Sequence, residues 1–137
     1  MRRTILVVED QTNFRRLVRH ALSRRFRVLE AEDASEAIDT LETERIDLVL
    51  LDLHLPPDVG SPREGLRVQE TVRKRFPETK VVLLTAEEDP EIRHQACTNG
   101  ALAWIEKPLE VALLQAALDR VLGALDGGAL EEKNGAV

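Results

Sequence analysis

Residues 5–10 have the sequence ILVVED, a short apolar run that ends abruptly in the acids Glu9 and Asp10. Residues 46–52, IDLVLLD, end in the same way at Asp52. Strands that are apolar almost without alternation are buried on both faces, as in a parallel sheet covered by helices. Acids just past the ends of such strands lie where a parallel α/β sheet opens its binding crevice. If the two ends meet, the clustered carboxylates need a cation or a proton.

Size and composition indicate one globular domain. The chain has 137 residues, 43% hydrophobic and 32% charged, which is ordinary for a globular protein. Its single cysteine, Cys97, excludes an internal disulfide and fits a reducing compartment. The sequence contains neither the core of a signal peptide nor an apolar stretch of membrane-helix length. We therefore expect a cytoplasmic protein without a membrane partner.

The distribution of charge bears on the partners. A formal net charge of −6 argues against direct binding of nucleic acid or of an anionic membrane. Positive charge is nevertheless concentrated in one early segment. Its arginines are Arg15, Arg16, Arg19, Arg24, Arg25 and Arg27. The segment is either a solvated helix face or a docking surface for an acidic protein, and the sequence leaves both open.

Strand-like runs alternate with amphipathic helical patterns along the chain. Strands are predicted over residues 4–8, 27–31, 46–51, 80–84 and 102–105. Helical stripes follow them over residues 14–22, 34–41, 66–76, 90–99 and 111–125. Asp33 and Asp89 are predicted N-caps, and Gly100 is predicted to end the fourth helix. Five such units predict an α/β fold, a doubly wound and mostly parallel sheet with helices on both faces.

Four short motifs follow successive predicted strands and carry a family resemblance. They are Glu9-Asp10, Asp52-Leu53-His54-Leu55-Pro56, Thr85-Ala86 and Lys107-Pro108. In this order they resemble the receiver domain of two-component response regulators, over about residues 4–122. We expect residues 1–122 to form this domain and residues 123–137 to form a flexible tail. The resemblance implies a flavodoxin-like fold with strand order 2-1-3-4-5, which would bring Asp52 beside Glu9 and Asp10.

The resemblance also implies a reaction. Asp52 would accept a phosphoryl group from a sensor histidine kinase or a histidine phosphotransfer protein, forming an aspartyl-phosphate. Asp10 and Asp52 would bind Mg²⁺ directly, with Mn²⁺ as an alternative. Glu9 would contribute through water and His54 through its backbone carbonyl.

Three further residues would complete the switch. Thr85 would hydrogen-bond a phosphoryl oxygen, and Lys107 would place a positive charge on the group. The resemblance implies a cis bond between Lys107 and Pro108. Trp104 stands where the family has a smaller aromatic ring that turns inward, although it could equally be a packing aromatic. The fourth helix, fifth strand and fifth helix would bind a downstream protein or a second copy of the chain.

The sequence departs from the family pattern after Asp52. Counting back from Thr85, Gly65 matches the glycine of the family pattern, so the loop over residues 57–64 carries about five extra residues before it. It could gate access to Asp52, slow aspartyl-phosphate hydrolysis, contact a partner, or be a tolerated insertion. Elsewhere, His94 and Cys97 share a predicted helix face, but two ligands are too few for a metal site.

Two other functions compete with this one. A degenerate receiver would bind partners without phosphorylation, which the intact Asp52, Thr85 and Lys107 argue against. A haloacid-dehalogenase-type phosphatase also uses an aspartyl nucleophile, but it requires a second Asp two positions later, where this chain has His54. We therefore expect no enzyme activity beyond self-phosphorylation and self-dephosphorylation. Only residues 123–137 follow the motifs, and the sequence leaves open whether the receiver acts alone.

Overall fold

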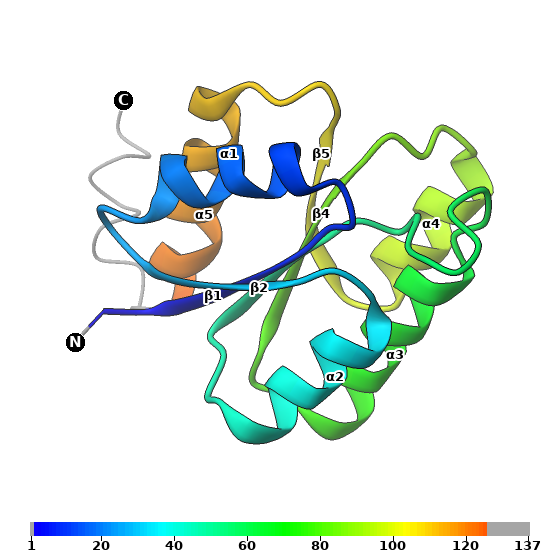
Figure 1. The fold of residues 1–137 in the computed structure, drawn as a ribbon, viewed down its shortest axis with the longest axis horizontal. Helices are drawn as coiled ribbons and strands as arrows, with labels where there is room; N and C mark the ends of the chain where they lie inside the picture. The colour runs from blue at the N-terminus through cyan, green and yellow to red at the C-terminus, as the bar shows by residue number, and fades with distance from the viewer. Residues whose placement is uncertain (1, 126–137) are drawn as a thin grey trace.

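Five strands and five helices alternate along the chain (Figure 1). The structure, a computed structural model, describes residues 2–125. The strands are β1 (Thr4–Val8), β2 (Arg27–Ala31), β3 (Leu48–Leu51), β4 (Lys80–Thr85) and β5 (Ala101–Glu106). The helices are α1 (Thr12–Leu22), α2 (Ala34–Thr43), α3 (Arg63–Arg75), α4 (Pro90–Thr98) and α5 (Val111–Leu125). Every predicted element is therefore present, with small changes at the boundaries.

The strands form one parallel sheet in the order β2-β1-β3-β4-β5. Helices α1 and α5 cover one face of this sheet, while α2, α3 and α4 cover the other (Figure 1). The chain reverses its direction of travel across the sheet between β1 and β3. In a doubly wound sheet that reversal opens a crevice at the carboxyl ends of the two strands. The predicted fold class and strand order are confirmed.

Burial on both faces explains the apolar run in β1. Ile5 and Val7 pack against α1 and α5, whereas Leu6 and Val8 pack against α2 and α3. All four side chains are buried. Because successive strand residues point to opposite faces, a strand between two helical layers needs apolar residues at every position.

Strand β3 begins at Leu48, two residues later than predicted. Asp47 accepts a hydrogen bond from the backbone N–H of Thr4 through Oδ2 (2.8 Å) and donates its own N–H to the Thr4 carbonyl (2.9 Å). The carboxylate of Asp47 thus accepts the Thr4 N–H in place of a backbone carbonyl, and Asp47 lies outside the strand. Ile46 stays buried in the core although it lies outside the strand.

The predicted helix boundaries have the expected capping contacts. Asp33 accepts from the backbone N–H of Glu36 (2.8 Å), and Asp89 accepts from that of Glu91 (2.9 Å). Gly100 follows α4 with φ of 105°, a left-handed conformation that glycine adopts without strain. These contacts satisfy backbone groups that a helix end leaves without partners.

The connection from β3 to α3 ends earlier than predicted, because α3 begins at Arg63 and includes two residues of the expected loop 57–64. Gly65 lies in the first turn of α3 and donates its N–H to the Leu53 carbonyl (3.1 Å). A Cβ at Gly65 would lie 2.3 Å from Cα of Leu53. The helix therefore packs backbone to backbone against the end of β3.

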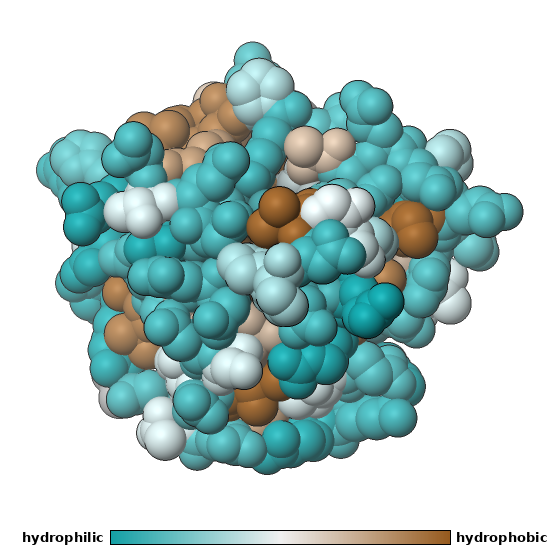
Figure 2. Space-filling view, turned by 45° about the vertical axis from the view of Figure 1, so that its right-hand side comes forward, coloured by the Kyte–Doolittle hydropathy of each residue, from teal (hydrophilic) through white to brown (hydrophobic). Residues whose placement is uncertain are grey.

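Other features bear on the sequence predictions. The Lys107–Pro108 peptide bond is cis as expected, and Pro56–Pro57 is a second cis bond. Residues 123–125 of the predicted tail belong to α5, while residues 126–137 lie outside the described residues. Within residues 2–125, no helix has the length and apolar character needed to cross a membrane. The face in Figure 2 is mostly hydrophilic, with apolar atoms in small separate groups.

The Gly65 contact predicts a large difference between two glycine substitutions. Gly65→Ala should lower the free energy of unfolding by about 2–3 kcal/mol, because the added methyl collides with backbone atoms that cannot move independently. Gly60→Ala is the matched control, since its Cβ would meet only Asp58 Oδ1 at 3.5 Å. The control should change stability by less than about 0.5 kcal/mol. Urea denaturation of both variants measures the difference, and equal effects would refute the close approach.

Candidate functional site

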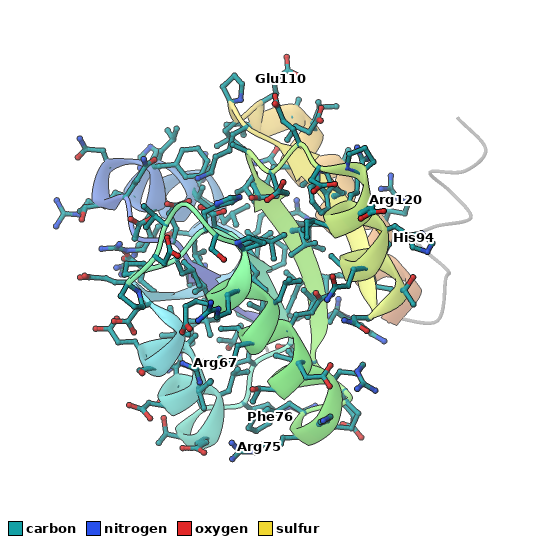
Figure 3. All side chains as sticks on the ribbon, turned by 90° about the vertical axis from the view of Figure 1, so that its right-hand side faces the viewer. Arg67, Arg75, Phe76, His94, Glu110 and Arg120 are labelled. Atoms are coloured by element: carbon teal, nitrogen blue, oxygen red, sulfur yellow. The ribbon has the colours of Figure 1, made fainter. Side chains whose placement is uncertain are left out.

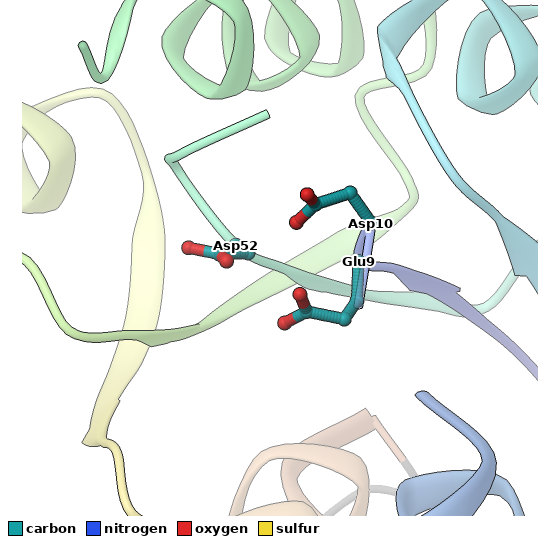
Figure 4. A group of neighbouring side chains, drawn as sticks. All are labelled: Glu9, Asp10 and Asp52. Carbon is teal, nitrogen blue, oxygen red and sulfur yellow. The ribbon is translucent and has the colours of Figure 1, made fainter. Parts of the chain in front are cut away.

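Three carboxylates meet at the carboxyl ends of β1 and β3. Glu9 and Asp10 follow β1, and Asp52 follows β3. One oxygen from each lies within 4.8 Å of the others. Figure 4 shows the carboxylates of Glu9 and Asp10 turned toward Asp52. The backbone keeps the two ends together, because the N–H of Asp52 donates to the carbonyl of Val8 (3.1 Å).

Both oxygens of Asp52 have hydrogen-bond partners. Oδ1 accepts from the Thr85 hydroxyl (2.8 Å) and from the backbone N–H of His54 (3.1 Å). Oδ2 accepts from the ammonium of Lys107 (3.0 Å). Asp52 is only 4% exposed and Thr85 is fully buried. The carboxylate is thus held in one orientation by groups from the ends of three strands.

Lys107 bridges two of the three carboxylates. Its Nζ also donates to Glu9 Oε1 (2.6 Å) and lies 4.5 Å from the centre of the Phe14 ring. Burial alone would lower the pKa of Lys107, but the hydrogen bond to Glu9 and the charges of Asp52 and Glu9 outweigh it. The net result is a raised pKa, so the side chain is a cation at neutral pH.

The pKa of Glu9 is raised in this crowded site. Burial raises its pKa to about 7, opposed by hydrogen bonds from Lys107 and from the backbone N–H of Gln11, and assisted by the charge of Asp52. The cluster contains three acids and one ammonium within bonding distance, so negative charge is in excess. A proton on Glu9 or a bound cation relieves that excess.

The donor set fits a hard divalent cation. The Asp10 carboxylate has no hydrogen-bond or ion-pair partner within residues 2–125, unlike those of Glu9 and Asp52. Carboxylate oxygens are preferred ligands of Mg²⁺, which retains several waters. A cavity of about 470 Å³ adjoins the cluster and offers space for them. Its lining residues are Asp10, Gln11, Asp52, His54, Val59, Ala86 and Lys107.

Comparison with known proteins decides the family. Residues 5–119 match the family described as "Response regulator receiver domain". The chain belongs to this family. It is 35% identical over 133 residues to the phosphate regulon transcriptional regulatory protein PhoB of Klebsiella pneumoniae, a match that covers 96% of this chain and 57% of PhoB. The receiver thus spans a little more than half the length of that relative.

Solved structures support the same assignment. A CheY-like receiver domain protein from Methanospirillum hungatei JF-1 is 27% identical with a TM-score of 0.80, covering 97% of this chain and 99% of that one. A response regulator protein from Burkholderia pseudomallei, described with a phosphorylated aspartic acid, a calcium ion and citrate, is 27% identical. Its TM-score is 0.76, with 94% of this chain and 74% of that one covered. The receiver therefore has the CheY-like fold that its motifs predict.

The His54 side chain closes one side of the receiver site. Its Nδ1 donates to the Val59 carbonyl (2.8 Å), and its Nε2 lies 2.8 Å from Glu87 Oε1. The ring thus connects the loop between β3 and α3 to the segment after β4. Glu87 was not predicted as a site residue, because only the loop conformation brings it to His54. The role predicted for the His54 carbonyl stays a prediction.

Two other predicted groups lie apart from the carboxylates. Trp104 pairs with Leu83 in the sheet, and the guanidinium of Arg93 lies 5.1 Å from its ring centre. Its Nε1 is buried without a hydrogen-bond partner. His94, labelled in Figure 3, and Cys97 are both exposed on α4. Neither belongs to the acid cluster, the one group within residues 2–125 that could hold a metal ion.

Not all arginines of the early basic segment lie on the surface. Arg16, Arg19, Arg24, Arg25 and Arg27 are exposed, whereas Arg15 is 7% exposed. Arg15 donates to the backbone carbonyl of Glu9 (2.7 Å) and to the carboxylate of Glu30 (2.7 Å). The prediction of one basic surface is therefore wrong for Arg15. An amphipathic pattern misses it because a buried arginine depends on partners from other strands.

The raised pKa of Glu9 predicts how stability depends on pH without divalent cations. The folded chain holds the Glu9 proton more tightly than the unfolded chain, whose glutamate titrates near 4.5. The free energy of unfolding should therefore fall as pH rises from about 4.5 to about 7, by on the order of 2–3 kcal/mol. Glu9→Gln should remove most of this slope in urea denaturation.

Glu88→Gln is the control for that experiment, because Glu88 is exposed and has no hydrogen-bond or ion-pair partner among the described residues. It should retain the slope of the unaltered chain. A slope that survives Glu9→Gln would show that another group carries the titration.

Proposed function

We propose that this receiver accepts a phosphoryl group on Asp52 from a phosphohistidine, with a divalent cation bound at the acid cluster. The observation that carries the proposal is the setting of Asp52. A buried carboxylate, held by a hydroxyl and an ammonium, lies against two further acids of which Asp10 is unpaired. The Burkholderia pseudomallei relative, described with a phosphorylated aspartic acid and a calcium ion, supports the same chemistry here.

In the proposed reaction an oxygen of Asp52 attacks phosphorus in line with the phosphohistidine nitrogen. The oxygen–phosphorus bond forms as the nitrogen–phosphorus bond breaks, and the leaving imidazole takes up a proton. Asp10 and Asp52 would hold Mg²⁺ or Mn²⁺ directly, with Glu9 acting through water and His54 through its backbone carbonyl. The bound cation supplies neutralising charge between the carboxylates and the phosphoryl oxygens.

Lys107 and Thr85 stabilise the phosphorylated form. The Lys107 ammonium, which contacts Asp52 Oδ2, is within reach of an oxygen on a phosphoryl group attached there. Thr85 donates to Asp52 Oδ1 before phosphorylation, and its hydroxyl would turn to the phosphoryl group afterwards. That turn is a local change which can bias the neighbouring α4 and β5.

The proposed partners act before and after this step. A sensor histidine kinase or histidine phosphotransfer protein supplies the phosphoryl group in the cytoplasm. The downstream protein binds the face formed by α4, β5 and α5, where Leu102 and Leu113 are 50% and 57% exposed. The same face would serve a homodimer. No direct binding of nucleic acid is proposed for residues 2–125, although PhoB is described as a transcriptional regulator.

The alternative functions fit the site less well. A degenerate receiver would not need the contacts that Thr85 and Lys107 make with Asp52. A phosphatase of the haloacid-dehalogenase type would need an acid at position 54, where the His54 ring instead contacts Val59 and Glu87. We propose no turnover beyond self-phosphorylation and self-dephosphorylation.

Labelling by a small phosphodonor tests the proposal. With acetyl phosphate and Mg²⁺ the unaltered chain should gain the mass of one phosphoryl group, measured by intact-mass spectrometry. Asp52→Asn should gain none, because the amide is not a competent nucleophile. Asp58→Asn is the matched control, since Asp58 contacts only its own loop. It should be labelled normally, and labelling of Asp52→Asn to the same extent would contradict the proposal.

Tryptophan fluorescence tests the switch. Trp104 is the only tryptophan and the chain has no tyrosine, so emission reports one site. Beryllofluoride with Mg²⁺, which mimics the phosphoryl group, should shift the emission, because Arg93 of α4 lies over the Trp104 ring and a movement of α4 would change that contact. Asp52→Asn should show no shift. Unchanged emission in the unaltered chain, with binding shown by fluorine NMR, would exclude Trp104 from the switch.

A further inference from the structure

Arg15 is the one buried arginine within residues 2–125, and it hydrogen-bonds the backbone of Glu9 in the acid cluster. It belongs to the first turn of α1. Its guanidinium contacts Glu9, which follows β1, and Glu30, which lies in β2. Nη1 donates to the carbonyl of Glu9 at 2.7 Å, and Nε donates to Glu30 Oε1, also at 2.7 Å. The side chain therefore links α1 to the chain after β1 and to β2.

The carbonyl that Arg15 holds belongs to the peptide group between Glu9 and Asp10. This carbonyl lies past the end of β1 at Val8, so it is outside the ladder of the sheet. On the other side of Glu9, the N–H donates to the Ala31 carbonyl of β2 (3.0 Å). A buried carbonyl without a donor is costly, so the Arg15 hydrogen bond favours the orientation of this peptide group in which its carbonyl is satisfied. Arg15 thus sets the peptide plane from which both acidic side chains project.

Glu30 keeps the guanidinium in place. Burial would raise the pKa of Glu30, but hydrogen bonds from Arg19 and Arg15 outweigh it and lower that pKa. Glu30 is therefore an anion that offsets the charge of Arg15. Arg19 donates to the second oxygen of Glu30 (2.6 Å) but has no contact with Glu9, and its side chain is 55% exposed.

We propose that Arg15, anchored by Glu30, is a positioning residue of the divalent-cation site. It fixes the peptide plane between Glu9 and Asp10 and so holds both carboxylates toward Asp52. The inference rests on the cation binding proposed above. Groups that orient metal-ligating side chains alter metal affinity by about 10- to 100-fold when they are removed. Arg15 touches no ligand oxygen, so its effect passes through the backbone.

The direction in which the Kd for the cation changes when Arg15 is replaced distinguishes a positioning role from a purely electrostatic one. Removing a positive charge near a cation site should tighten cation binding if charge alone mattered. Removing the group that orients two ligands should weaken it. Arg15 and Arg19 provide a matched pair, because both bind Glu30 and only Arg15 reaches Glu9.

Mg²⁺ titration of the full chain tests the proposal, with isothermal calorimetry as the measurement and Mg²⁺ alone as the probe. Arg15→Met should raise the Kd by about tenfold. Arg19→Met should change it by less than about twofold. Arg15→Lys keeps the charge but lacks the planar fork that spans two acceptors, so its Kd should also rise. Equal or tighter binding by Arg15→Met would overturn the proposal.

Folding is checked separately by thermal melting of each variant. If Arg15→Met does not fold, Arg15→Lys carries the test, because it keeps the positive charge and loses only the planar fork, so its Kd should still rise. An unchanged Kd in folded Arg15→Lys would overturn the role of Arg15. Failure of the unaltered chain to bind Mg²⁺ would instead refute the proposed cation site, and with it this inference. The two failures are therefore distinguishable.

Discussion

The ion pair of Lys107 with Glu9 and Asp52 is the interaction on which the site depends. Three acids at the ends of two adjacent strands repel one another in a poorly solvated crevice. One ammonium contacts two of them at 2.6 and 3.0 Å and lowers that cost. Because one ammonium does not cancel the charge of three carboxylates, the cluster keeps an excess of negative charge that a proton on Glu9 or a cation would relieve.

The parallel sheet makes this concentration of charge possible. All five strands run in the same direction, so their carboxyl ends share one edge, where the backbone leaves the hydrogen-bonded ladder. Residues from the ends of β1, β3, β4 and β5 converge there without any long segment crossing the fold. The apolar interior of the strands, buried on both faces, supplies the stability against which charged groups can be held close together.

The sequence predicts the position of residues that follow a strand end, but it does not predict the position of residues that depend on long-range contacts. Asp52, Thr85 and Lys107 each follow a recognisable apolar run, so topology alone brings them together. The sequence pattern places Arg15 among several surface arginines. Its burial depends on acceptors after β1 and in β2, which the pattern does not show. Glu87 was missed for a similar reason, since its contact with His54 depends on the path of a loop without periodicity.

The backbone contact between Leu53 and Gly65 has a consequence for the loop between β3 and α3. The loop leaves from a residue at the end of β3 and returns to the first turn of α3, and the two are joined by a hydrogen bond of 3.1 Å. Leu55 is buried and has to be kept, whereas residues 57–60 are exposed, so residues can be inserted among them at a cost that is mainly closure entropy. The scaffold thus allows the rim of the site to be remodelled, naturally or by grafting, while the sheet and the acids beneath stay in register.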